Sequence, residues 1–132
     1  MKKGKSFVVI ITIIAVVALI LSFGLEQFIK INISQNEENA QTILRNIATA
    51  CENYAKDHQG RYPAQESNLI NIKPAYLRYP YHTKTIQGYT YALNLTETGY
   101  HITASPLICG LSGNKIYTIT TTSILTEETC KQ

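Results

Sequence analysis

Aspartate is nearly absent from this chain of 132 residues, since only one of its 9 acidic residues is an aspartate, Asp57. Calcium needs several hard oxygen ligands close together, and the pair Glu127-Glu128 has no acidic neighbours. The histidines fall in three separate predicted elements, without the short spacing to one another or to a Cys-x-x-Cys pair that zinc sites show: His58, His82 and His101. The sequence therefore predicts no metal site.

An excess of basic residues is also missing from most of the chain. The formal net charge is +3, and Lys2, Lys3 and Lys5 account for all of it. The remainder is close to neutral, so we expect no nucleic-acid-binding surface. No serine, cysteine or histidine lies in a recognised catalytic signature, so the sequence predicts no enzyme, no catalytic residue and no cofactor.

A long apolar run does occur, from Phe7 to Leu25, interrupted only by Thr12 and Ser22. As a helix it would be about 28 Å long, which is enough to cross the hydrocarbon core of a bilayer. A cleaved secretory signal would have a shorter apolar core followed by a small-x-small site, which is absent here. The run therefore predicts a single membrane span.

The basic leader, residues 1–6, sets the orientation of this span. Three lysines before the apolar run favour a cytoplasmic N-terminus, so residues 26–132 would lie on the far side of the membrane. Disulfides are tolerated in such a compartment.

The residues after the span form the second half of the same predicted helix. Apolar residues recur at steps of three and four and form one stripe: Ile43, Leu44, Ile47, Ala48, Cys51, Tyr54 and Ala55. No proline occurs between Phe7 and Gln59, which predicts one helix of about 50 residues ending near residue 59. Gly24 and the polar stretch 32–36 are its weakest points, because glycine and short polar residues disfavour helices.

A structured connection and an antiparallel sheet are predicted after the helix. Residues 60–86 hold three of the four prolines and no sustained period, with a helical turn expected near Ser67. Alternating residues from 87 onward, with turns at 96–99 and Ser123, predict strands over residues 87–129. The striped helix is the only long apolar surface that could cover this sheet, so the predicted class is α+β.

The segment Asn36–Ile70 resembles the type IV pilins and pseudopilins, in which a helix ends in a Tyr-x-x-Asp/Asn-x-Gly-x-Tyr-Pro turn. The alternating stretch 88–106, followed by a Gly-rich loop and a further strand, is also similar to the sheet of small pilin-like proteins. The resemblance implies a pilin-like fold, with a long helix packed on a small antiparallel sheet.

The resemblance also implies a function and partners. The protein would be a structural or accessory subunit of a type IV pilus or a secretion pseudopilus. It would lie in the inner membrane before assembly, and its globular domain would be periplasmic or extracellular. Its partners would be other pilin-like subunits, a leader peptidase and an assembly platform. The apolar helices would pack together in the filament core through residues that include Phe7, Val16, Ile20 and Leu25.

The leader departs from the family pattern of a glycine followed by Phe-Thr-Leu-Ile-Glu. Cleavage between Ser6 and Phe7 places Ile11 where the family has glutamate, and cleavage between Gly4 and Lys5 does no better. This departure favours a minor or unprocessed pilin-like protein. It also supports an alternative function, that of a single-pass inner-membrane protein with a periplasmic binding domain that does not polymerise.

Three cysteines allow three single pairings, and strand register selects one of them. If the chain reverses at 121–123, an antiparallel register brings Cys130 level with Asn114, at the sheet end where Cys109 lies. We therefore predict a disulfide between Cys109 and Cys130. Cys51 lies on the helical stripe and is expected to be a buried thiol.

Tyrosines are concentrated in the connection, where Tyr76, Tyr79 and Tyr81 surround Arg78. They could form an exposed aromatic platform, because tyrosine offers a large ring with a polar tip. The alternative, which we favour, is that they serve loop and strand packing, which tyrosine also suits.

Overall fold

The structure is a computed structural model that describes residues 3–131, and it divides into two units, one on each side of the Asn32–Ile33 bond. One helix, α1 (Lys3–Asp57), contributes to both units. It continues through Gly24 and residues 32–36, where the sequence favours a helix least. Unbroken backbone hydrogen bonding outweighs these local preferences, which amount to about 1 kcal/mol per residue.

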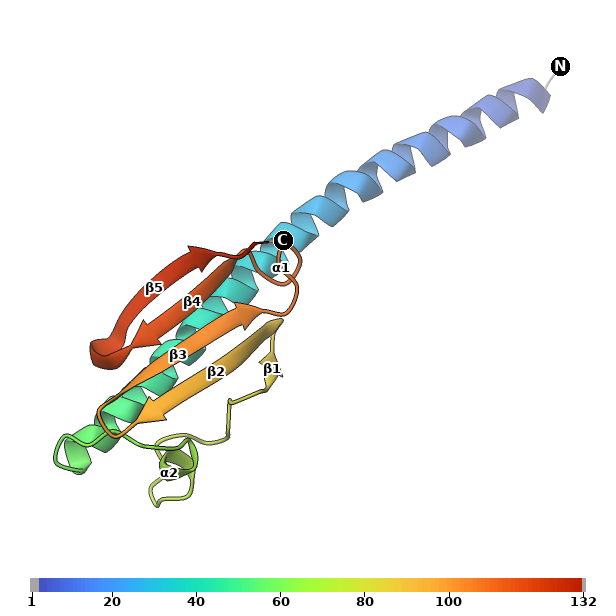
Figure 1. The fold of residues 1–132 in the computed structure, drawn as a ribbon. Coiled ribbons are helices and arrows are strands. Elements are labelled where there is room, and N and C mark those ends of the chain that lie inside the picture. Colours follow the sequence, from blue (N-terminus) through green and yellow to red (C-terminus); the bar gives the residue numbers. More distant parts are fainter. Residues whose placement is uncertain (1–2, 132) are drawn as a thin grey trace. The chain divides into compact units, whose positions relative to one another are not determined.

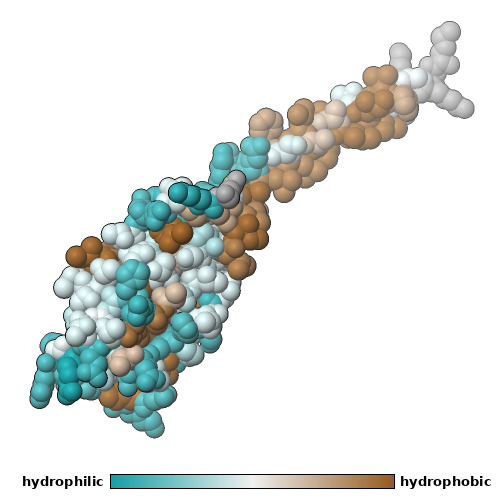
Figure 2. Space-filling model, viewed as in Figure 1, coloured by the Kyte–Doolittle hydropathy of each residue, from teal (hydrophilic) through white to brown (hydrophobic). Residues whose placement is uncertain are grey.

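The first unit consists of the apolar part of α1, which Figure 2 shows as a mostly brown rod. Its two interrupting polar side chains are satisfied within the helix. Thr12 Oγ1 donates to the Val8 carbonyl at 2.8 Å, and Ser22 Oγ donates to the Ala18 carbonyl at 2.9 Å. Neither hydroxyl therefore needs water, which suits an apolar surrounding.

The second unit contains a five-stranded antiparallel sheet in the order β1-β2-β3-β4-β5 (Figure 1). Its strands are β1 (Thr85–Ile86), β2 (Tyr89–Thr96), β3 (Gly99–Pro106), β4 (Lys115–Thr120) and β5 (Ile124–Thr129). Short turns join successive strands except β3 and β4, which are connected by the loop 107–114. Two short helices complete the unit, α2 (Ser67–Ile70) and the 3-10 turn η1 (Thr121–Ser123). The sequence missed β1, because two residues are too few to show a period.

The C-terminal part of α1 packs on this sheet, which confirms the predicted α+β fold of a long helix on an antiparallel sheet. The helix buries a stripe of small and branched residues: Ala40, Leu44, Ile47, Ala48, Ala50, Cys51 and Ala55. The sheet contributes alternate residues of its strands: Tyr89, Tyr91, Tyr100, Ile102, Ala104, Tyr117 and Ile119. Of the predicted stripe, Ile43 and Tyr54 are only partly buried.

Helix α1 ends where the sequence places its stop signals. Gln59 and Gly60 both adopt positive φ, at 60° and 84°, and the Gly60 amide donates to the Ala55 carbonyl at 2.8 Å. This closure satisfies a carbonyl at the helix end, as glycine caps commonly do.

Candidate functional site

The apolar part of α1 is the largest exposed hydrophobic surface among the described residues. The four residues predicted to pack in a filament core are all exposed: Phe7 (66%), Val16 (49%), Ile20 (65%) and Leu25 (62%). The surface continues past Leu25 through Phe28 and Ile31. Apolar patches of this extent mark a membrane or protein contact, because exposure to water is costly. By length and composition, this helix could span a membrane.

Both candidate cleavage positions lie inside α1. Gly4, Lys5, Ser6 and Phe7 are helical, and Gly4, Ser6 and Phe7 are exposed. Ile11, which the resemblance noted above sets against the glutamate of the pilin pattern, is an exposed apolar residue of the same helix.

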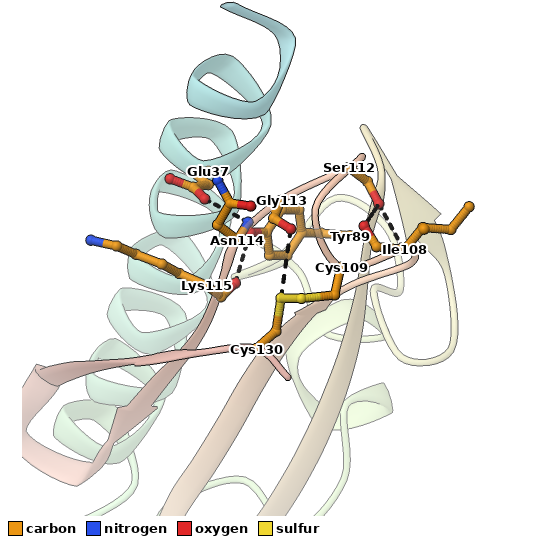
Figure 3. The surroundings of a disulfide bond; sticks show 9 residues. All are labelled: Glu37, Tyr89, Ile108, Cys109, Ser112, Gly113, Asn114, Lys115 and Cys130. Carbon is orange, nitrogen blue, oxygen red and sulfur yellow. Dashed lines mark hydrogen bonds between the residues drawn. A yellow bond between two sulfur atoms is a disulfide. The ribbon is translucent and has the colours of Figure 1, made fainter. Parts of the chain in front are cut away.

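Cys109 and Cys130 form a disulfide, as the strand register predicted, with their Cα atoms 6.0 Å apart (Figure 3). Strands β4 and β5 pair Ile119 with Leu125, and the Cys130 amide donates to the Asn114 carbonyl at 2.9 Å. The bond therefore ties the end of β5 to the loop between β3 and β4. Cys51 is buried and unpaired, as expected for a residue of the helical stripe.

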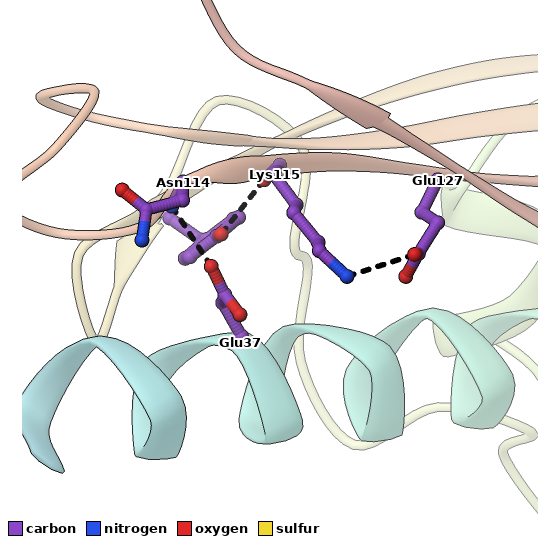
Figure 4. A network of polar contacts seen from close by, with 5 residues as sticks. Glu37, Asn114, Lys115 and Glu127 are labelled. Atoms are coloured by element: carbon purple, nitrogen blue, oxygen red, sulfur yellow. Dashed lines mark hydrogen bonds and ion pairs between the residues drawn. The ribbon is translucent and has the colours of Figure 1, made fainter. Parts of the chain in front are cut away.

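The same loop, residues 107–114, is attached to α1 by two hydrogen bonds. Asn36 Nδ2 donates to the Ser112 carbonyl at 2.9 Å, and the Asn114 amide donates to Glu37 Oε1 at 2.8 Å (Figure 4). Ser112 Oγ in turn accepts from the Ile108 amide at 2.7 Å. Asn36, from the polar stretch that disfavours a helix in isolation, and its neighbour Glu37 thus hold the disulfide loop.

We expect loss of the disulfide to destabilise the second unit strongly. The bond closes a loop with a sequence separation of 21, for which chain entropy gives about 3 kcal/mol. A Cys109→Ser, Cys130→Ser double variant should therefore melt about 10 °C lower by circular dichroism. Cys51→Ser is the control for thiol loss, and non-reducing peptide mapping should show the 109–130 crosslink intact in it. Equal melting of the double variant and the parent would contradict this expectation.

A second polar cluster surrounds Glu52 on the helix. Its carboxylate accepts from Tyr100 Oη at 2.8 Å, from Tyr62 Oη at 3.0 Å and from the Thr122 amide at 3.0 Å. Thr122 has a φ of 71°, a strained conformation for a branched residue, and Glu52 holds it there. Sequence analysis missed this cluster, because its members are far apart along the chain and follow no fixed spacing.

Burial keeps the Cys51 thiol and the Tyr91 hydroxyl protonated. It raises the pKa of the Cys51 thiol from 9.0 to about 12, with a smaller contribution from neighbouring Glu52, and it raises the pKa of Tyr91 to about 12. Both groups are therefore neutral in the folded protein at ordinary pH.

These raised pKa values predict alkaline unfolding. Above pH 9 the unfolded chain loses the Cys51 proton while the folded protein keeps it, so the contribution of Cys51 to the free energy of unfolding should be constant below about pH 9 and fall toward pH 12. Urea denaturation at several pH values measures this slope. Cys51→Ala should show a shallower fall between pH 9 and 10, because the contribution of the thiol is then absent. An unchanged slope would contradict the assignment to Cys51.

The histidines, Asp57 and Glu127 make separate contacts in the structure. His58 stacks on Tyr54 with ring centroids 3.8 Å apart, His82 bridges to β2, and His101 is exposed on β3. Asp57 Oδ2 accepts from Tyr76 Oη at 2.6 Å, and Glu127 pairs with Lys115 at 2.8 Å. Within residues 3–131, no group of three or more histidine, cysteine or acidic side chains could hold a metal ion.

Comparison with known proteins adds no assignment, since no family model, curated protein or solved structure matches the chain.

Proposed function

We propose that this protein is a structural or accessory subunit of a pilin-like filament, either a pilus or a secretion pseudopilus. The observation that carries the proposal is α1, whose first part exposes apolar side chains all round while its last part is covered by an antiparallel sheet. The first part of such a helix can pack against other subunits, while its last part belongs to a folded domain that would lie on the filament surface.

The apolar segment can be shielded from water in two environments, a lipid bilayer and the core of a filament. In lipid its backbone polar groups are satisfied within the helix, so it can be stored as a single span. In a filament, copies of the segment would bury Phe7, Val16, Ile20 and Leu25 against one another. Lys2, Lys3 and Lys5 favour a cytoplasmic N-terminus in the inner membrane, and the disulfide suits a periplasmic or extracellular domain.

A minor or unprocessed subunit fits the leader better than a major one does. Ile11 has no carboxylate to pair with a neighbouring N-terminus, and Ser6 replaces the glycine before Phe7. The partner in such a role is an assembly platform, joined by a leader peptidase where the leader is cleaved.

The second candidate is a single-pass inner-membrane protein whose periplasmic domain binds a ligand without polymerising. The absence of a carboxylate at Ile11 favours it. In this case the apolar helix is an anchor only.

Mass spectrometry of the native N-terminus, combined with a sheared-filament preparation, distinguishes the two. The filament proposal expects the protein in sheared filaments, with a trimmed and methylated N-terminus near Phe7 if it is processed. An intact N-terminus together with complete absence from filaments would support the non-polymerising alternative.

A further inference from the structure

An open groove of about 370 Å³ lies on the second unit, between the helix and the tyrosine-rich connection. The helix side presents Asn46, Thr49 and Asn53, which the i, i+3, i+7 spacing places on one face. Ala50 lies on the same face and is buried, so its small side chain leaves room between the walls. None of these four residues carries a charge.

The two asparagines are free to bind a ligand. Both side chains are exposed on α1, and neither side-chain amide makes a hydrogen bond to another of the described residues. An asparagine amide offers two donors and a carbonyl acceptor. The helix wall therefore carries neutral groups of both kinds within one groove.

The opposite wall is held in place before any ligand arrives. The amides of Tyr76 and Leu77 both donate to the Leu69 carbonyl, at 2.9 and 3.0 Å, and Tyr76 Oη donates to Asp57. Tyr79 is 49% exposed, and its ring centroid lies 5.0 Å from that of buried Tyr81. A supported, exposed ring is a stacking surface that costs little entropy to use.

Charge narrows the chemistry of the ligand. Among the described residues, Arg78 is the only charged one that lines the groove, and no carboxylate lines it. The carboxylate of Asp57 touches Tyr76, where its Oδ2 already accepts a hydrogen bond. An anionic group on a ligand would thus meet one guanidinium, which can bind a carboxylate through two parallel hydrogen bonds.

We propose that this groove binds an acidic oligosaccharide. Sugar hydroxyls match the free amides of Asn46 and Asn53, a sugar ring can lie on Tyr79, and a sugar carboxylate can pair with Arg78. A protein partner fits less well, because protein interfaces rely on a buried apolar centre and Tyr79 is the only large exposed hydrophobic residue in the groove. Nucleic acid would require more cations than Arg78 alone.

The test is to titrate sugars into the full chain in micelles of dodecylphosphocholine, a detergent without a sugar headgroup. NMR and calorimetry measure binding. The probes are sialyllactose with neutral lactose as its control, and tetragalacturonate with its methyl ester. We expect at least one acidic sugar to bind about tenfold more tightly than its neutral counterpart and to shift the Asn46 and Asn53 amide signals.

Variants separate this groove from adventitious binding. Arg78→Gln should abolish the preference for the acidic sugar, and Tyr79→Ala should weaken both sugars about tenfold. Arg61→Gln, which removes an exposed arginine from a different surface, should leave binding unchanged, and the melting temperature of each variant reports its folding.

Three results would overturn the proposal. One is the absence of binding by either acidic sugar at about 10 mM. Another is binding that survives both groove variants or shows no preference for the acid. The third is movement of the groove signals with protein concentration but not with sugar, which would assign the groove to contact between copies. The result of this assay does not bear on the proposed filament role, because no filament is required in it.

Discussion

A Val16→Asp variant is expected to remain in the membrane but to form no filaments. One aspartate at the centre of a span costs about 3 kcal/mol, which the remaining apolar residues between Phe7 and Leu25 offset. A filament core would place the same carboxylate in every subunit, in an apolar surrounding and near its copies. Burial of unpaired like charges is far more costly than the single insertion.

Membrane fractionation and electron microscopy of sheared filaments measure the two effects separately. Val16→Leu is the matched control, because it keeps the segment apolar and should assemble normally. Ile20→Asp should behave like Val16→Asp, since both residues are exposed on the apolar segment. Normal filaments from either aspartate variant would mean that the segment serves only as an anchor.

A Gly113→Ala variant is expected to destabilise the second unit by about 3 kcal/mol and to lower its melting temperature by about 10 °C. A Cβ atom at Gly113 would overlap Tyr89 Oη and lie 2.6 Å from Tyr89 Cζ. The Tyr89 ring cannot move away easily, because it is completely buried and its hydroxyl donates to the Lys115 carbonyl at 2.7 Å (Figure 3).

Two variants test the cause of this effect. Gly60→Ala meets no atom within 4 Å but forces alanine to a φ of 84°, so it should cost only about 1 kcal/mol of backbone strain. Tyr89→Leu removes the hydroxyl and the ring atoms that the new methyl group would meet, so the Gly113→Ala, Tyr89→Leu double variant should lose less stability than the sum of the single changes. Additive losses would show that the clash with Tyr89 is not the cause.

Local rules predicted much of this protein from its sequence. The apolar run, the stripe from Ile43 to Ala55 and the stop signals near Gly60 predicted one long helix, because helical period and capping depend on neighbours within a few residues. The Cys109–Cys130 pairing was predictable for a similar reason. A tight reversal at 121–123 fixes the register of β4 and β5, and that register carries Cys130 to the level of Asn114.

The contacts that hold the elements together were decided only by the tertiary structure. Glu52 looks like an ordinary polar-face residue in the sequence, yet it accepts from Tyr100 and the Thr122 amide, which are distant along the chain. Asn36 favours a break in the helix when judged locally, but its bond to the Ser112 carbonyl makes it part of the disulfide loop's support. The groove beside Tyr79 likewise depends on how the connection crosses α1. Such contacts join residues with no fixed spacing, so they form only when packing of the core brings their elements together.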